Sequence, residues 1–104
     1  MTENIQKQKL IEAIAFQEGS IVSKQIIKNQ CGNLTLFAFD KDESLSEHTS
    51  PYNAFVYLIE GEMEIKIGDE IYNITTGEMI VMPANIPHGL KALQKSKMLL
   101  VMIK

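Results

Sequence analysis

The chain of 104 residues contains no arginine and no tryptophan, and all of its fixed positive charges are lysines. Arginine supplies the planar, two-pronged group that grips phosphates and carboxylates, so its absence argues against nucleotide or sugar-phosphate binding. The formal net charge is −3 and the lysines form no cluster, so the positive surface typical of a nucleic-acid-binding protein is missing. We therefore expect no nucleic-acid partner.

Cysteine is almost absent, because Cys31 is the single one and no internal disulfide can form. It lies in a polar turn sequence without a neighbouring histidine, which favours a turn thiol over a catalytic nucleophile. Long hydrophobic runs are missing too, since the longest, residues 98–103, is far too short to span a bilayer, and the polar N-terminus has no signal-peptide core. We expect a reduced, cytoplasmic setting and no membrane partner.

Short apolar and β-branched stretches, separated by frequent turn residues, make up most of the chain. They predict strands, and their number predicts an all-β sandwich or closed barrel without α/β alternation. Partial helical spacing at residues 10–15 favours a short N-terminal helix. We expect an N-terminal segment at residues 1–20 and one barrel domain at residues 21–104. The expected strands cover residues 21–28, 33–40, 54–60, 63–67, 71–74, 79–82, 88–93 and 97–103.

Two stretches raise specific expectations about the barrel. Residues 41–47 are charged, and we expect a loop that delivers the chain to His48. Residues 98–103 are apolar at every position, so a strand there needs cover on both faces. The barrel core covers one face, and either a second subunit or the N-terminal segment covers the other. We expect a homodimer, with cover by the N-terminal segment as the alternative.

The only two histidines, His48 and His88, lie far apart, each beside a proline-containing turn and next to a strand-like stretch. Two histidines at strand ends predict one shared site inside a barrel. Neighbouring side chains of a strand point to opposite faces, so Glu47 is expected to face away from that site. Core packing is the commoner role of methionine in strands, but four methionines are candidates to line an adaptable apolar pocket: Met79, Met82, Met98 and Met102.

About half of the chain resembles the cupin superfamily, in particular its small single-domain bacterial members of the cupin type-2 conserved barrel kind. His48 and Gly61 fall on the first motif of that family, and Gly77, Pro83 and His88 fall on the second, at the family's spacing. The resemblance implies a double-stranded β-helix, the jelly-roll barrel. It also implies that the two histidines occupy metal-ligand positions.

Metal-dependent cupins hold their ion with three histidines and one carboxylate, and half of that set is missing here. Ser50 stands in place of the second histidine and Ala54 in place of the carboxylate. Asn85 and Asp42 each replace a glycine, which is mild for Asn85 because asparagine tolerates left-handed backbone conformations. Two imidazoles alone cannot fill the shell of a divalent ion or offset its charge. We expect no tightly bound metal, and at most a weakly bound divalent transition metal.

The leading functional hypothesis is a cytoplasmic cupin that binds a small, largely apolar molecule in a pocket formed by His48, Ser50, Ala54 and His88. One alternative is a metal-dependent oxygenase, isomerase or decarboxylase that uses His48 and His88 as an incomplete ligand set. Another is a structural or regulatory dimer with a vestigial pocket. A pocket filled by the protein's own side chains would favour this last alternative. The sequence names neither the ligand nor a catalytic residue.

Overall fold

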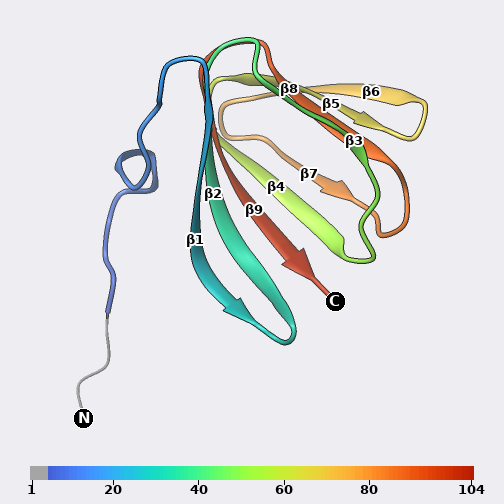
Figure 1. Ribbon diagram of the computed structural model, residues 1–104, viewed down its shortest axis with the longest axis horizontal. Coiled ribbons are helices and arrows are strands. Elements are labelled where there is room, and N and C mark those ends of the chain that lie inside the picture. Colours follow the sequence, from blue (N-terminus) through green and yellow to red (C-terminus); the bar gives the residue numbers. More distant parts are fainter. Residues whose placement is uncertain (1–4) are drawn as a thin grey trace.

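The computed structural model describes residues 5–104, which form nine strands in two antiparallel sheets. The larger sheet has the order β1 (Ile21–Asn29), β2 (Gly32–Phe39), β9 (Ser96–Ile103), β4 (Asn53–Glu60) and β7 (Met79–Met82). The smaller sheet has the order β3 (Ser44–His48), β8 (His88–Ala92), β5 (Glu62–Ile67) and β6 (Glu70–Thr75). The sheets face each other across a shared core (Figure 1), which confirms the predicted all-β jelly-roll barrel.

Strand β3 lies where the sequence predicted a charged loop over residues 41–47. Leu45 is the only apolar residue of this strand, and the other four positions are exposed at the edge of the smaller sheet. The strand forms because β8 offers it hydrogen-bonding partners, in a register that pairs Leu45 with Leu90. The loop prediction holds for residues 41–43 and was wrong for residues 44–47, because a mostly polar edge strand carries almost no hydrophobic alternation.

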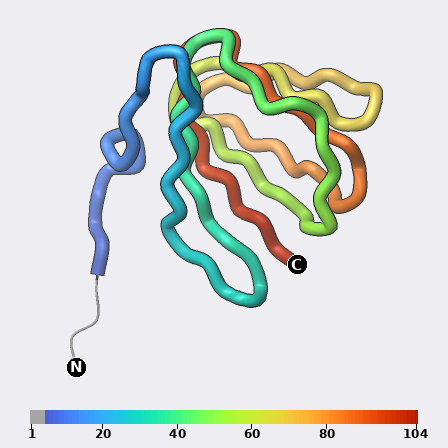
Figure 2. Tube along the Cα trace, in the orientation of Figure 1, coloured from blue at the N-terminus to red at the C-terminus, as the bar shows by residue number. Residues whose placement is uncertain are grey.

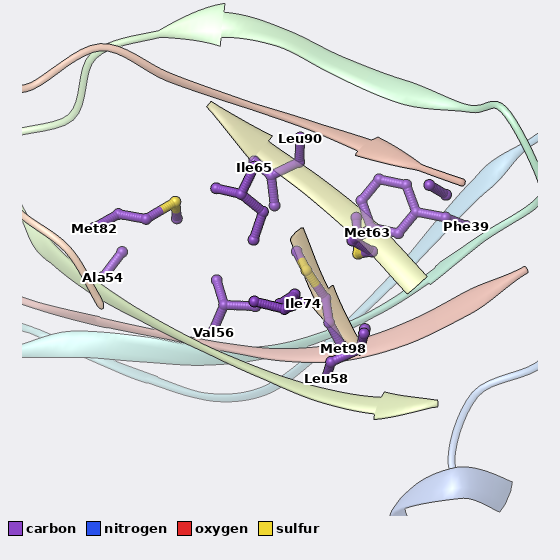
Figure 3. Packing of buried hydrophobic residues seen from close by; sticks show 11 residues of the cluster. Phe39, Ala54, Val56, Leu58, Met63, Ile65, Ile74, Met82, Leu90 and Met98 are labelled. Carbon is purple, nitrogen blue, oxygen red and sulfur yellow. The ribbon is translucent and has the colours of Figure 1, made fainter. Parts of the chain in front are cut away.

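The core between the sheets consists of alternate residues from facing strands. In β4 the outward positions alternate with three buried ones, Ala54, Val56 and Leu58. Figure 3 shows side chains from both sheets pointing toward one another, with Met82 and Ala54 at one end of the core and Phe39 and Met63 at the other. Removal of these apolar faces from water is the main driving force for closing the two sheets.

The only helical element within residues 5–104 is one turn of 3-10 helix, η1 (Leu10–Glu12). The short helix expected at residues 10–15 is therefore reduced to this turn, because so short a segment gains too few hydrogen bonds to offset the cost of nucleating a helix. Across the same described part of the chain, no helix combines the length and the apolar character needed to cross a membrane.

Residues 5–20 of the N-terminal segment cover part of the outer face of the larger sheet, and Figure 2 shows them running beside β1. Ile14 is buried there with Leu36 of β2, and Leu99 of β9 packs against the same cluster. Lys97 is almost fully buried and donates a hydrogen bond from Nζ to the carbonyl oxygen of Ile11. Cover by the N-terminal segment therefore applies to the Leu99 end of β9.

Within residues 5–104, the other end of that outer face is only partly covered. Strand pairing sets Leu34, Val101 and Phe55 side by side on β2, β9 and β4. Ile27 on β1 and Val81 on β7 extend the row at its two ends, and more than half of each of these two residues is exposed. We refer to these five residues as the outer apolar row.

Candidate functional site

Strands β3 and β8 bring the two histidines together, as their positions at strand ends predicted. His48 and His88 are register partners, and their ring centroids lie 4.4 Å apart with the rings inclined at 68°. The register of β3 shifts between Leu45 and His48. Leu45 and His48 are three positions apart and would point to opposite faces of a regular strand. Because of the irregularity between them, both side chains line the same cavity.

A cavity of about 40 Å³ lies against the two rings, between the sheets. The smaller sheet supplies part of its wall, namely Leu45, His48, His88 and Leu90. The larger sheet supplies the rest, namely Ala54, Met82, Met98, Leu100 and Met102. Apart from the imidazoles, the wall consists of hydrocarbon and thioether groups. Three of the four methionine candidates thus line the cavity, whereas Met79 is half exposed.

Of the four residues predicted to form the ligand pocket, His48, Ser50, Ala54 and His88, only Ser50 does not line this cavity. Its Oγ accepts a hydrogen bond from the backbone N–H of Tyr52 at 3.1 Å, in the turn between β3 and β4. Strand β3 ends at His48, so Ser50 lies beyond the strand and strand alternation no longer determines the face to which it points. Ala54, at the start of β4, does face the cavity and is almost fully buried.

Glu47 faces away from the site, as strand alternation predicted. Its Oε2 lies 3.0 Å from Nζ of Lys66, and both side chains are about half exposed. An ion pair so open to water adds little to stability. The carboxylate nearest to His48 in the sequence is therefore engaged on the outer surface and is not available to the cavity.

Backbone carbonyls orient both imidazoles. Nδ1 of His48 donates a hydrogen bond to the carbonyl oxygen of Ser46 at 2.8 Å, and Nδ1 of His88 donates to that of Ile86 at 3.3 Å. Burial lowers the pKa of His88 from its ordinary 6.5, the hydrogen bond to Ile86 opposes this effect, and nearby His48 lowers the pKa further. The neutral imidazole of His88 is therefore favoured at neutral pH.

Two turns flanking the site use a left-handed backbone. Asp42 has a φ of 71° and Asn85 a φ of 67°, and no other non-glycine residue within the described range has a positive φ. Both stand where the family motifs carry glycine, so the structure retains the backbone conformation without the glycine. The N–H of Asn85 also donates a hydrogen bond to the carbonyl oxygen of Ser50 at 2.8 Å, which joins the loops that follow β7 and β3.

The donors at this site do not fit the metal-ligand set that the resemblance implies. The carboxylate position carries the methyl group of Ala54, and the hydroxyl of Ser50 is held in a turn. Over residues 5–104, no three histidine, cysteine, aspartate or glutamate side chains gather in a way that could hold a metal ion. Cys31 is an exposed free thiol in the turn between β1 and β2. The site instead presents two imidazoles to an apolar cavity.

Three leucines of the cavity wall were not singled out from the sequence: Leu45, Leu90 and Leu100. Leu90 follows His88 by two positions and so shares its face of β8, and Leu100 lies between Met98 and Met102 in the same way. Strand alternation could have found both of these leucines. Leu45 gave no such signal, because it lies in the stretch that was predicted to be a loop.

Two facing antiparallel sheets with a histidine-bearing cavity between them define a jelly-roll barrel of the cupin class. The sequence pattern of the family described as "Cupin domain" matches residues 35–104. The chain therefore belongs to the cupin family.

Solved structures give the same result. The SPY1581 protein of Streptococcus pyogenes, described as a conserved protein of unknown function, is 34% identical, with 99% of this chain and 90% of that chain covered at a TM-score of 0.92. A Cupin 2 conserved barrel domain protein from Leptotrichia buccalis is 36% identical at a TM-score of 0.88, with 91% of this chain but only 46% of that chain covered. A cupin superfamily protein of Desulfitobacterium hafniense, 22% identical, shares the fold at a TM-score of 0.84 over 86% of this chain and 83% of that chain. None of the curated proteins compared with the chain matches it.

Proposed function

We propose that this protein is a cytoplasmic cupin that binds a small, largely apolar molecule in the cavity beside His48 and His88, without a tightly held metal. The observation that carries this proposal is the composition of the cavity wall, in which two imidazoles are the only polar side chains. An apolar cavity with a few convergent polar groups is typical of small-molecule sites. The exposed free thiol of Cys31 fits a reducing compartment.

The size of the cavity limits the ligand. About 40 Å³ accommodates only a few water-sized groups and is far below the several hundred Å³ of most ligand pockets. Met82, Met98 and Met102 are unbranched and flexible, so their rearrangement is the least costly way to admit a larger guest. The ligand is therefore a molecule of few heavy atoms, or one that enters as these side chains move.

A cavity-filling substitution tests the proposal. Ala54→Val adds two methyl groups to the cavity wall and should abolish binding of a small neutral compound such as 1-butanol, measured by saturation-transfer NMR. The added volume is expected to cost about 1 to 3 kcal/mol of folding stability, so the fold of the variant is checked by circular dichroism. Ser50→Ala is the matched control and should bind normally, because Ser50 lies outside the cavity. Equal binding by the wild type and the Ala54→Val variant would contradict the proposal.

We further infer that a divalent transition metal binds at most weakly, through His48 and His88. The alternative function, a metal-dependent enzyme, requires the substrate to complete a coordination shell that the protein leaves half empty. Elemental analysis of tag-free, dialysed protein separates the two. Manganese, iron, nickel or zinc at one equivalent per chain would support the enzyme and contradict the binding module.

A second candidate function is a structural or regulatory homodimer with a vestigial pocket. Two observations favour it: the protein's own side chains fill most of the barrel, and the outer apolar row is partly exposed within residues 5–104. A second copy related by a two-fold axis would cover this row with the same row of its own. Ligand binding and dimerisation are compatible with each other. A wild-type protein that dimerises but binds no ligand would favour the homodimer with a vestigial pocket over the binding module.

A further inference from the structure

The hydrogen bonds of the two imidazoles determine which nitrogen of each ring is available to a ligand. A carbonyl oxygen only accepts hydrogen bonds, so Nδ1 of His48, bonded to Ser46, and Nδ1 of His88, bonded to Ile86, must carry the hydrogen. A neutral imidazole has one N–H group. Nε2 of each neutral ring therefore presents a lone pair and acts as an acceptor.

These acceptor nitrogens have no partner within residues 5–104. The backbone carbonyl is the only hydrogen-bond partner of each ring in that range. Every side-chain nitrogen or oxygen there that is fully shielded from solvent has a partner. Nε2 of His88 has none, so it must reach the cavity or the solvent, although only 5% of the residue is exposed. His48 is exposed and lines the same cavity, which places it at the mouth.

The other side chains of the cavity wall offer no hydrogen-bond donor. They are four aliphatic side chains, Leu45, Ala54, Leu90 and Leu100, and three thioethers, Met82, Met98 and Met102. Thioether sulfur is itself a weak acceptor. A ligand group that only accepts hydrogen bonds would lose its water there and gain no partner, and burying a charged one would cost most.

We propose that this cavity selects small apolar molecules that carry a hydroxyl or N–H donor, and that it rejects carboxylates and donor-free carbonyl compounds. The donor bonds to Nε2 of His48 or His88, and the apolar body contacts the methionines and leucines. This inference rests on the proposed function and adds the chemical class of the ligand to it.

Three four-carbon probes test this selectivity at pH 8, where histidine side chains are neutral. 1-Butanol carries a donor, butanone carries only an acceptor, and butyrate carries a charged acceptor. Long-range ¹H–¹⁵N NMR of histidine-labelled protein reports the tautomer of each ring and the environment of each Nε2 during the titrations. We expect the Nδ1–H tautomer in both rings, a shift of at least one Nε2 signal on adding 1-butanol, and binding about tenfold weaker or undetectable for the other two probes.

His48→Leu and His88→Leu remove one acceptor each while keeping an apolar side chain, and at least one of them should abolish the preference for 1-butanol over butanone. His48 is exposed, so its variant is expected to fold even if the His88 variant does not. Equal binding of the three probes, tighter binding of butyrate, or an Nε2–H tautomer in both rings would overturn the donor selectivity and leave the binding function intact. No binding of any probe up to its solubility limit would overturn the proposed function as well.

Discussion

His88 is a buried imidazole whose protonation opposes folding. Its folded pKa lies below the unfolded value near 6.5, so the unfolded chain binds a proton more readily. The stability that this residue contributes is fully present above that value and is lost as the pH falls from it toward the folded pKa. Among the residues that line its cavity, His48 is the only other titratable group. Hydrogen bonds to Asp40 and Glu78 lower the pKa of both carboxyl groups from 3.8 and 4.5, so these groups titrate below this window.

We therefore expect the free energy of unfolding in urea to decrease between about pH 7.5 and about pH 5, and His88→Gln to flatten that decrease. His48→Gln is the comparison for a histidine at the mouth of the same cavity. Equal slopes for the wild type and the His88→Gln variant would show that His88 protonates equally well in the folded and unfolded chains.

At the scale of single residues, three of the four residues that were predicted to share a pocket line one cavity, and the fourth does not. His48, Ala54 and His88 line the cavity because positions on regular strands follow an alternation that can be read from the sequence. Ser50 does not, because it lies beyond the end of β3, where strand alternation no longer applies. Asn85 adopts the left-handed backbone conformation that asparagine was expected to tolerate there, with a φ of 67°. Asp42, which also replaces a glycine of the family motif, adopts the same conformation.

At the scale of elements, the turn between β4 and β5 depends on a glycine with no room for a side chain. Gly61 has a φ of 110°, and a methyl group on its Cα would collide with Oγ of Ser96 and come within 2.5 Å of the carbonyl oxygen of Lys95. Gly77, in the turn before β7, has a φ of 88° but open space around it. Both glycines have a positive φ, which strains other residues, but only at Gly61 would an added side chain also collide with its neighbours.

Gly77→Ala should therefore cost about 1 kcal/mol of folding stability from backbone strain alone, and Gly61→Ala about 2 kcal/mol more from the added collision. Urea unfolding of the two variants at one pH provides the comparison. Similar losses of stability in the two variants would show that the chain around Ser96 moves aside easily to make room for a side chain at position 61.

The same scale shows why most strands were predictable and β3 was not. Strands with buried faces show apolar alternation or continuous apolar runs, and these were found to within a few residues at each end. Strand β3 is held at the edge of its sheet by pairing with β8, and its sequence is mostly polar. Its existence depends on a partner far away in the sequence, which no local pattern reports.

At the scale of the whole molecule, the outer apolar row is the surface to test for dimerisation. Val101→Lys places a charge in the middle of this row, and burying it against a second copy would be unfavourable. We expect a dimer for the wild type and a monomer for the variant in light scattering coupled to size-exclusion chromatography. Ile71→Lys changes an exposed isoleucine on the smaller sheet and should leave the dimer intact. A monomeric wild type at high concentration would contradict the dimer.

Leu99 is not a substitute for Val101 in that experiment, although both lie in the last strand and both face outward. Leu99 packs against the N-terminal segment with Ile14, so a lysine there would disturb the fold of one chain. The sequence left open whether a partner or the N-terminal segment covers this strand. The structure shows the segment covering its Leu99 end, and cover of the Val101 end by a second copy stays a prediction.

The most direct test of the proposed binding site is a crystal structure of the tag-free protein soaked in 1-butanol, read for density between His48 and His88. We predict elongated density in the cavity, with the hydroxyl oxygen within hydrogen-bonding distance of an Nε2 and the methionine side chains displaced to admit the chain of the alcohol. We predict no anomalous scattering peak at the histidines. A cavity closed by its own side chains at saturating 1-butanol, or a fully coordinated metal ion on the two rings, would contradict a metal-free binding site for small apolar molecules.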